Sequence, residues 1–305
     1  MTIGQIQEDF LSPSSKTRLT PEDFFMLLAH ASGKSREYLL AHPEYELGAE
    51  AGMRARKYFA RRITREPVAY ITGGKEFFGL PFRVTHDTLI PRPETELLVE
   101  RVIADCRLQI ADCESETPKN ILIADIGTGS GSIIIALAHT LGKDTGCMMH
   151  DIRYEFHAVD ISKAALDIAE GNADRNGVAD MITFHEGNHI EPIKKIFHEA
   201  DEIILTANLP YLSESIYASA SDDVKRHEPK DALLSGKDGL DHYRTLFGMM
   251  APHALPGKNV SIFCEISPEQ ELLAEELART YFPHGKIDTF PDLSGRTRVL
   301  EISLE

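Results

Sequence analysis

The sequence of 305 residues contains few cysteines, and their spacing excludes the common metal-binding patterns. The four are Cys106, Cys113, Cys147 and Cys264, with no C-x-x-C pair and no zinc-finger spacing. We therefore expect no metal site, and we interpret the four as buried or incidental thiols of a protein in a reducing compartment.

The chain also lacks the segments that direct a protein to a membrane or out of the cell. No apolar run approaches the length needed to span a bilayer. The first ten residues contain neither the basic segment nor the apolar segment of a signal peptide. No internal repeat or low-complexity stretch is visible. We expect a cytoplasmic protein that does not bind membranes.

Positive charge is scarce as well. Lys and Arg number 32 against 48 Asp and Glu, which gives a net charge of −16. A protein that holds nucleic acid through bulk electrostatics carries a basic face, so this balance argues against stable nucleic-acid binding. It leaves room for basic protein partners and for local basic patches. The length allows one large domain or two smaller ones.

An apolar run that ends in a glycine-rich turn, residues 121–131, is the most informative stretch. Its first four residues predict a buried strand, and Asp125 follows them. A tight turn then precedes a predicted helix, whose N-terminus suits a nucleotide-like ligand. A dinucleotide site needs its third glycine one residue later than Gly131. Asp125 instead suits a cationic group, such as the amino group of S-adenosylmethionine. The turn's glycines are Gly127, Gly129 and Gly131.

Beyond this turn, apolar runs of strand length alternate with amphipathic stretches of helix length. Such alternation predicts a mostly parallel sheet covered by helices on both faces, with ligands at the carboxyl ends of the strands. The predicted strands are 121–126, 154–159, 181–185, 202–206, 259–265, 285–290 and 297–303, and the predicted helices are 131–142, 163–176, 239–251 and 268–280.

The region before the sheet divides into two parts. Residues 1–74 predict short helices, one of which begins with Thr20 as its N-cap and Pro21 as its first residue. Within residues 67–97, glycine turns separate short aromatic and β-branched runs, which predicts a β-hairpin linker. Arg92 and Glu94 lie near the end of this region, and they face either a pocket or solvent.

Two further strand ends carry polar residues that suit an adenosine-containing ligand. Asp160 ends a predicted strand, where a carboxylate accepts hydrogen bonds from both ribose hydroxyls. Asn188 and His189 follow the next strand, where the amide would bond an adenine ring and the imidazole would stack on it. Taken alone, His189 fits an ordinary loop equally well.

The exit of the fourth predicted strand reads Asn208-Leu209-Pro210-Tyr211. A planar amide or aromatic amine is a poor nucleophile because its nitrogen lone pair is delocalised. If an Asn oxygen and a backbone carbonyl accept its two N–H groups, the lone pair is aimed at an electrophilic methyl group. Tyr211 offers a flat face that packs on the planar group. The pattern therefore predicts methyl transfer to such a nitrogen.

The whole chain resembles the HemK/PrmC family, the release factor glutamine methyltransferases. The resemblance implies a class I methyltransferase, an α/β Rossmann-like fold with a mostly parallel seven-stranded sheet, after a small N-terminal helical domain and a β-hairpin linker. The implied domains are 1–74 for release-factor recognition, 75–97 for the linker and 98–305 for catalysis. The motifs that carry it are Pro67-Val-Ala-Tyr-Ile-Thr-Gly, Phe77-Phe-Gly-Leu, Leu89-Ile-Pro-Arg-Pro-Glu-Thr-Glu, Asp125-Ile-Gly-Thr-Gly-Ser-Gly, Val159-Asp, Asn208-Leu-Pro-Tyr, Glu228-Pro-Lys-Asp-Ala-Leu, Asp238-Gly-Leu-Asp-His-Tyr-Arg and Asp292-Leu-Ser-Gly-Arg-Thr-Arg.

The family implies methyl transfer from S-adenosylmethionine to the side-chain nitrogen (N5) of the glutamine in the Gly-Gly-Gln loop of class I peptide chain release factors. The implied catalytic residues are Asn208, Pro210 and Tyr211, which with Leu209 bind the substrate amide. The implied cofactor-binding residues are Asp125, Gly127, Thr128, Gly129, Ser130, Gly131, Asp160, Asn188, His189 and Asn208.

One position departs from the family, which usually has Asn-Pro-Pro-Tyr where this chain has Leu209. Leu209 supplies the same backbone carbonyl, and Pro210 still restricts its conformation. The Asn-Leu-Pro-Tyr form is also similar to adenine dimethyltransferases of ribosomal RNA. Adenine N6-methylation of RNA or DNA is therefore the alternative activity, and a non-catalytic binding protein is a third. We expect a monomer.

Overall fold

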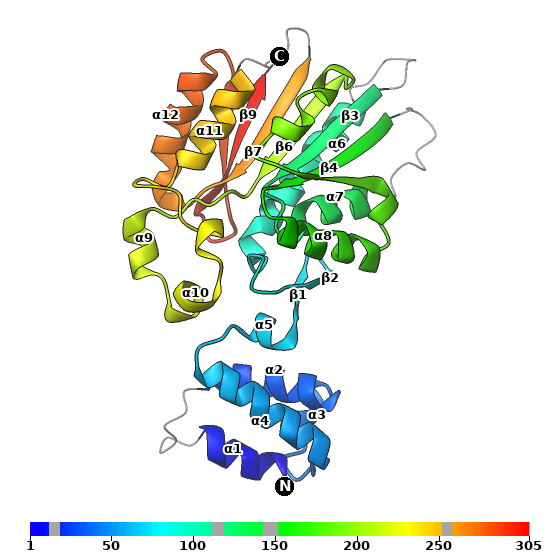
Figure 1. Ribbon diagram of the computed structural model, residues 1–305, viewed down its shortest axis with the longest axis vertical. Helices are drawn as coiled ribbons and strands as arrows, with labels where there is room; N and C mark the ends of the chain where they lie inside the picture. Colours follow the sequence, from blue (N-terminus) through cyan, green and yellow to red (C-terminus); the bar gives the residue numbers. More distant parts are fainter. Residues whose placement is uncertain (12–18, 112–118, 143–151, 252–257, 305) are drawn as a thin grey trace. The chain divides into compact units, whose positions relative to one another are not determined.

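The computed structural model describes residues 1–11, 19–111, 119–142, 152–251 and 258–304, and its contacts divide the chain into two compact units (Figure 1). Unit 1 comprises Met1–Gly74 together with Ala220–Glu228, and unit 2 comprises Lys75–Ser219 and Pro229–Glu305. The segment 220–228 lies inside the stretch that the sequence assigns to the catalytic domain. No pattern in the sequence indicates that it packs with the N-terminal helices.

Unit 1 is helical, as the sequence predicts. Thr20 caps its second helix by accepting a hydrogen bond from the Asp23 amide at 3.1 Å, and Pro21 is the first helical residue. Apolar side chains fill its core, in which the Phe24 and Phe59 rings stack with their centroids 5.0 Å apart. The helices are α1 (Ile3–Leu11), α2 (Pro21–Ser32), α3 (Arg36–Ala41), α4 (Ala49–Ile63), α5 (Val68–Thr72) and α10 (Asp222–His227).

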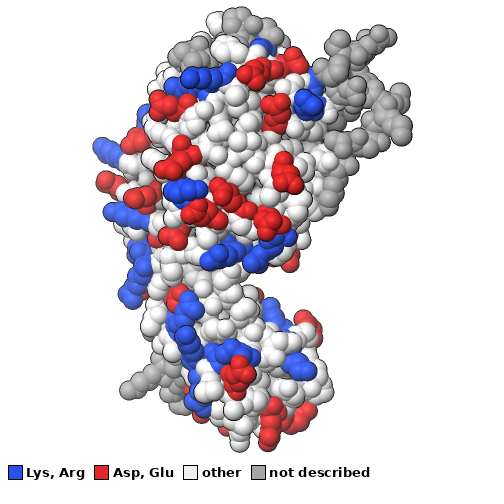
Figure 2. All heavy atoms as spheres, turned by 45° about the vertical axis from the view of Figure 1, so that its right-hand side comes forward, with Lys and Arg blue, Asp and Glu red and all other residues white. Residues whose placement is uncertain are grey.

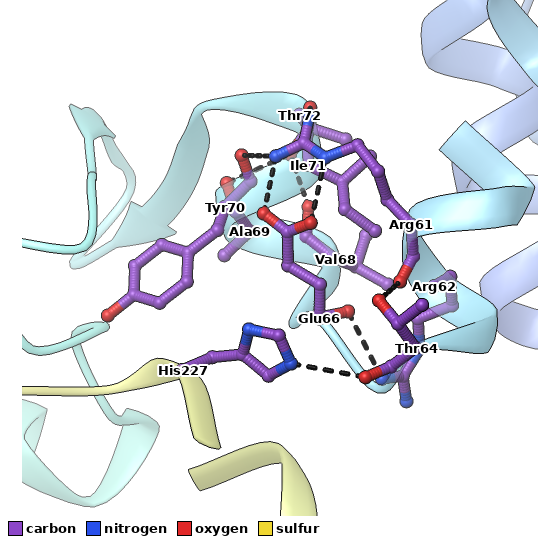
Figure 3. Close-up of polar contacts among 10 residues, drawn as sticks. All are labelled: Arg61, Arg62, Thr64, Glu66, Val68, Ala69, Tyr70, Ile71, Thr72 and His227. Atoms are coloured by element: carbon purple, nitrogen blue, oxygen red, sulfur yellow. Dashed lines mark hydrogen bonds and ion pairs between the residues drawn. The ribbon is translucent and has the colours of Figure 1, made fainter. Parts of the chain in front are cut away.

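The β-branched run at 68–72 forms helix α5, so the prediction that it is part of the hairpin is wrong. Arg61 at the end of α4 explains the difference, because its guanidinium pairs with the Glu66 carboxylate and also donates to the carbonyls of Tyr70 and Ile71 (Figure 3). These late carbonyls of a short helix have no partner within it. A tertiary contact therefore stabilises a helix that the local propensity of Val68–Thr72 does not favour.

The segment 220–228 joins unit 1 through polar contacts. Arg62 bridges two acids, donating to Asp23 at 2.9 Å and to Asp223 of α10 at 2.6 Å. His227 lies 3.2 Å from the carbonyl oxygen of Thr64 (Figure 3). The chain thus leaves unit 2 after the Asn208–Tyr211 motif, pairs with unit 1 and returns.

Unit 2 begins at Lys75, inside the hairpin of β1 (Gly74–Phe77) and β2 (Leu80–Arg83). The short 3-10 turn η1 (Pro93–Thr95) and helix α6 (Glu96–Ala111) follow. Seven of its described strands form one sheet in the order β5-β4-β3-β6-β7-β9-β8. β9 runs antiparallel to both of its neighbours, and the other pairs are parallel. This confirms the predicted fold class. The strands are β3 (Lys119–Ile126), β4 (Ile152–Asp160), β5 (Ile182–Glu186), β6 (Glu202–Ala207), β7 (Asn259–Glu265), β8 (Lys286–Pro291) and β9 (Thr297–Leu304).

Helices cover both faces of the sheet, and alternation along β3 shows how (Figure 1). Ile121 and Ile123 point into a core shared with α6, whereas Leu122 and Ala124 point into the core on the opposite face. The helices on the first face are α6, α7 (Ser132–Leu141) and α8 (Lys163–Arg175), and those on the second are α11 (Asp241–Met250) and α12 (Glu271–Tyr281), while α9 (Glu214–Ser219) precedes the crossing into unit 1.

The chain reverses its direction of winding between β3 and β6. β4 and β5 extend the sheet on one side of β3, and β6 and β7 extend it on the other. Loops that leave the carboxyl ends of strands separate at such a point and leave a crevice for a ligand. The glycine turn follows β3, Asp160 ends β4, and Asn208 follows β6, so the topology brings the predicted residues to one edge.

Two of the predicted buried thiols, Cys106 and Cys264, are indeed buried and unbonded, and burial raises the pKa of both above the usual value. Cys113 and Cys147 lie outside the described residues. In the part of the chain that the structure describes, no helix combines the length and apolar character needed to traverse a bilayer.

Candidate active site

A cavity of about 470 Å³ opens at the carboxyl edge of the sheet in unit 2, within the size range of small-molecule sites. Loops after four of the strands contribute to it, together with the segment before η1. Its lining includes the following predicted residues: Gly127, Thr128, Gly129, Ser130, Asp160, Asn188, His189, Asn208, Leu209 and Pro210. The predicted residues Asp125, Gly131 and Tyr211 are not part of this lining.

The glycine turn is anchored to the neighbouring strand through its backbone. The amides of Gly127 and Thr128 both donate to the Val159 carbonyl of β4, at 2.8 and 3.0 Å. Gly127 has a φ of +74°, and a Cβ there would lie 2.8 Å from Cδ2 of Leu209. Only glycine suits this backbone and this close approach. The turn after β3 therefore packs directly on the residue that follows Asn208.

Asp125 lies beneath this turn and is fully buried. Its two carboxylate oxygens accept hydrogen bonds from the hydroxyls of Thr128, at 2.6 Å, and Thr206, at 2.8 Å. Burial raises the pKa of Asp125 to about 6, although both hydroxyls act in the opposite direction. The geometry therefore shows an acid that connects the glycine turn to β6, and the direct contact with a cofactor that the sequence predicts stays untested.

Asp160 lines the cavity and also holds the glycine turn. Its carboxylate accepts from the Gly129 amide and from the Ser162 amide, each at 2.8 Å. Burial raises the pKa of Asp160, and the backbone hydrogen bonds counteract that effect. An acid with this position has free acceptor capacity for hydroxyl donors, because each carboxylate oxygen accepts more than one hydrogen bond.

Asn188 and His189 lie together, with the Asn188 Oδ1 atom 2.7 Å from Nδ1 of His189. His189 has a φ of +49° and is buried, and its ring stacks on His242 with centroids 5.7 Å apart. Burial, with a smaller effect of His242, lowers the pKa of His189, which favours a neutral ring. His242 thus covers one face of an imidazole that the sequence assigns to adenine stacking.

The side chain of Asn208 is held in place by hydrogen bonds from its amide nitrogen, Nδ2. Its Nδ2 donates to Oε2 of Glu265 at 3.0 Å and to the Thr95 hydroxyl at 3.1 Å. Its Oδ1 is buried and has no hydrogen-bond partner among the described residues. Asn208 is also one of the residues that line the cavity, so this unused acceptor belongs to the cavity wall. Glu265 itself is buried at the end of β7.

Tyr211 is fixed from two sides. Its hydroxyl donates to Oε1 of Glu265 at 3.1 Å, and its carbonyl accepts from Nε2 of Gln270 at 2.8 Å. Gly239 packs against the same carbonyl so closely that a Cβ there would lie 2.2 Å from the oxygen. Burial raises the pKa of the Tyr211 hydroxyl above its usual value, so the group stays a neutral donor.

Sequence reasoning missed several residues of this site. Arg92 was predicted to face either a pocket or solvent, and it lines the cavity, whereas Glu94 is not among the lining residues. Thr95, Glu265 and Gln270 were not singled out. Thr95 follows Glu94 directly in the Pro-Arg-Pro-Glu-Thr-Glu motif, and Glu265 ends an apolar run, the position at which Asp125 and Asp160 were noticed. Thr206 and His242 were also missed.

The residues present fit S-adenosylmethionine. The cavity combines exposed turn backbone at Gly127 and Gly129, a carboxylate at Asp160 and a planar, neutral ring at His189. These are groups for a charged amino-acid end, for ribose hydroxyls and for a heterocycle respectively. Gly127 is exposed at the cavity, and the bare backbone of a glycine suits a ligand that approaches closely.

Known protein families match both parts of the chain. Residues 15–73 match the PrmC N-terminal domain, and residues 118–221 match a methyltransferase domain. A release factor glutamine methyltransferase of Moorella thermoacetica is 37% identical over 273 residues, which cover 90% of this chain and 87% of that protein. The corresponding enzyme of Bacillus subtilis is 33% identical over 275 residues, covering 90% and 88%.

The catalytic domain of human Mettl16, solved in complex with an RNA hairpin of the MAT2A 3′UTR, has a similar fold. The TM-score is 0.50 at 16% identity, and the match covers 84% of this chain and 80% of that one. At this identity the likeness concerns the fold alone. The relatives above, by contrast, match almost the whole chain, and the resemblance stated from the motifs is confirmed. The chain belongs to the release factor glutamine methyltransferase family and is an S-adenosylmethionine-dependent methyltransferase.

Proposed function

We propose that this protein methylates the side-chain nitrogen (N5) of the glutamine in the Gly-Gly-Gln loop of class I peptide chain release factors. The observation that carries the proposal is the unpartnered Oδ1 of Asn208 at a cavity that also contains the glycine turn. A carboxamide nitrogen has two donors and needs acceptors, which Asn208 and the Leu209 carbonyl supply. The family's name and its match over most of the chain support the same substrate.

In this proposal the two sides of the cavity have separate tasks. Backbone of the turn 127–131 holds the amino-acid end of the cofactor, Asp160 binds the ribose, and His189 lies against the adenine. Asp125 and Gly131 act from behind the turn by fixing its shape, and Tyr211 acts by fixing the Asn208 loop. S-adenosylmethionine supplies an electrophilic sulfonium methyl group when it is bound.

The protein's own contribution is orientation. Asn208 and Leu209 hold the substrate amide in the plane that exposes its nitrogen lone pair, and Pro210 keeps Leu209 extended. Positioning of this kind accounts for large rate accelerations without a general base. The proton that leaves the nitrogen after methyl transfer is acidic and passes to solvent.

Unit 1 is proposed to recognise the release factor. Its match to the PrmC N-terminal domain supports a binding role. The substrate places the reaction in the cytoplasm, where peptide release takes place.

Adenine N6-methylation is the alternative that the same geometry would accept, since an aromatic amine also presents two donors. The net charge of −16 disfavours it. On the larger, upper part of the face shown in Figure 2, acidic and basic side chains intermingle. Electrostatics therefore favour a protein substrate.

The direct test is mass spectrometry of an unmethylated release factor after incubation with the enzyme and S-adenosylmethionine. We expect a single added methyl group, mapped to the glutamine of Gly-Gly-Gln. The control is the same factor with that glutamine replaced by alanine, which should stay unmodified. Methylation of the alanine variant, or of neither factor while nucleic acid is methylated, would refute the proposal.

A further inference from the structure

Glu265 lies at the end of β7, next to β6 in the sheet, and its buried carboxylate contacts two residues of the Asn208–Tyr211 loop. We propose that Glu265 is a positioning residue that decides which end of the Asn208 amide meets the substrate. It acts through Asn208 and does not itself line the cavity. The inference rests on the proposed function, because it assumes that Asn208 receives a substrate amide.

The Nδ2 atom of Asn208 donates to two partners, Thr95 and Glu265. Thr95 contributes a hydroxyl, which by itself donates or accepts, but which accepts from Nδ2 here because its proton is donated to Glu265. Glu265 contributes a carboxylate, which only accepts. If the amide were reversed, its oxygen would face the oxygen of Glu265 at about the same 3.0 Å. Glu265 therefore distinguishes the orientations directly, and Thr95 does so only through its own hydrogen bond to Glu265.

The surroundings of Glu265 match an ionised carboxylate. Each of its oxygens receives a donor, the Asn208 amide on Oε2 and the Tyr211 hydroxyl on Oε1. Burial raises the pKa of Glu265, while hydrogen bonds from Thr95 and Tyr211 and the nearby charge of Arg298 counteract this. The acid is also rigidly placed, because the Tyr243 hydroxyl contacts the carbonyls of both Ala207 and Glu265 and so joins the ends of β6 and β7.

The consequence concerns substrate choice as well as rate. With Nδ2 bound to Glu265, Asn208 offers an acceptor, which pairs with the N–H of glutamine. An ionised glutamate has no N–H and would meet this acceptor unfavourably. Glu265 thus gives the site its preference for an amide over a carboxylate, from a position that the substrate does not touch.

The test is E265Q, which keeps the size of the side chain but offers either a donor or an acceptor to Asn208. We expect kcat for release-factor methylation to fall on the order of 10- to 100-fold, by partial loss of an oriented acceptor. The dissociation constant of S-adenosylhomocysteine, measured by calorimetry, should change by less than about threefold, since the cofactor groups are unaltered.

A second readout would not respond to a purely structural defect. Binding of two release factors is compared in the presence of S-adenosylhomocysteine, one with Gly-Gly-Gln and one with its glutamine replaced by glutamate. Wild-type enzyme should prefer the glutamine factor, and E265Q should reduce that ratio about tenfold. E265D keeps an acceptor-only group, so it should retain the ratio even if its rate is lower.

The matched control is E202Q. Glu202 is a buried glutamate at the opposite end of the sheet, on the strand that leads to Asn208, and it pairs with Lys119. This variant should keep both kcat and the binding ratio, whatever its thermal stability. An unchanged kcat and ratio in E265Q would overturn the inference while wild-type activity upheld the proposed function. Absence of methylation by the wild type would overturn the proposed function first.

Discussion

Two buried carboxylates flank β6 at the active-site edge, and they do different work. Asp125 is the penultimate residue of β3 on one side, and Glu265 is the last residue of β7 on the other. Asp125 accepts from two threonine hydroxyls, which tie the glycine turn to β6. Glu265 accepts from Asn208 and Tyr211, the side chains of the predicted substrate motif. Asp125 therefore shapes the backbone of the turn 127–131, which we call the cradle, and Glu265 orients side chains.

The difference shows why the two halves of the site should respond differently to substitution. The cradle depends on backbone φ angles and close packing. It should therefore be sensitive to an added Cβ and tolerant of a change in the charge of Asp125, which lies beneath it. A side-chain constellation depends on donors and acceptors, so it is sensitive to isosteric changes of hydrogen-bonding type. The following substitutions test this contrast, beginning with the largest expected effect.

Asn208→Ala removes the acceptor on the substrate side. We expect methyl transfer to fall by about 10²- to 10³-fold, the range for loss of one oriented hydrogen-bonding group in a transition state. Binding of S-adenosylhomocysteine should stay within about threefold, because the cradle is intact. Single-turnover mass spectrometry and calorimetry measure the two quantities.

Asn176→Ala is the matched control for that variant. Asn176 follows α8 and donates to the Pro81 carbonyl at 3.1 Å, so its loss affects packing away from the cavity. It should lower thermal stability and leave transfer nearly unchanged. Transfer retained by Asn208→Ala would contradict the role of its Oδ1, and transfer lost equally in both variants would indicate a folding defect instead.

Gly127→Ala tests the cradle. A left-handed φ of +74° costs an alanine about 1–2 kcal/mol, and its Cβ would lie 2.8 Å from Leu209 Cδ2. We expect the dissociation constant of S-adenosylhomocysteine to rise about tenfold, with a further loss of transfer because Leu209 is displaced. Calorimetry on Gly295→Ala provides the comparison, since Gly295 has a φ of +78° with no neighbour within 4 Å. Equal cofactor affinities for the two variants would show that close packing at Gly127 is unimportant.

The fold was largely predictable because its signals are local. The apolar run at 121–124, the glycine turn and the alternation of strand and helix lengths all depend on neighbouring residues. The parallel sheet then places strand ends at one edge, so Asp160 and Asn208 could be assigned to one site before their distances were known. The run at 68–72 was misassigned because Arg61 stabilises α5 from outside it.

The site residues that the sequence does not indicate are those whose position depends on which strands are neighbours. Glu265 and Asn208 are 57 residues apart, and nothing in their local sequence indicates that β6 and β7 pair. For Asp125, the sequence identified the residue but not its contacts. Its place in the glycine motif suggested contact with a ligand, whereas the register of β3 and β6 sets it beside Thr206. Sequence identifies the polar residue at a strand end, and only the packing shows which way it points.

Asp125→Asn should have the smallest effect on binding, and it tests whether this acid touches the cofactor. An asparagine accepts from one threonine hydroxyl and donates to the other, so the turn keeps its shape. We expect the dissociation constant of S-adenosylhomocysteine to change by less than about threefold at pH 7. A rise of tenfold or more would show the direct contact with the cofactor's amino group that the sequence predicts.

The same variant should alter the pH dependence of stability. Burial raises the pKa of Asp125 to about 6 from a usual value near 4. Between these values the unfolded chain releases its proton while the folded chain retains it, so the free energy of unfolding falls as pH rises, by up to about 3 kcal/mol. Asp125→Asn lacks this titration. In denaturant unfolding, its free energy of unfolding should therefore rise relative to that of the wild type between pH 4 and pH 7. A stability difference that is constant across this range would mean that the two threonine hydroxyls fully compensate the burial of the charge.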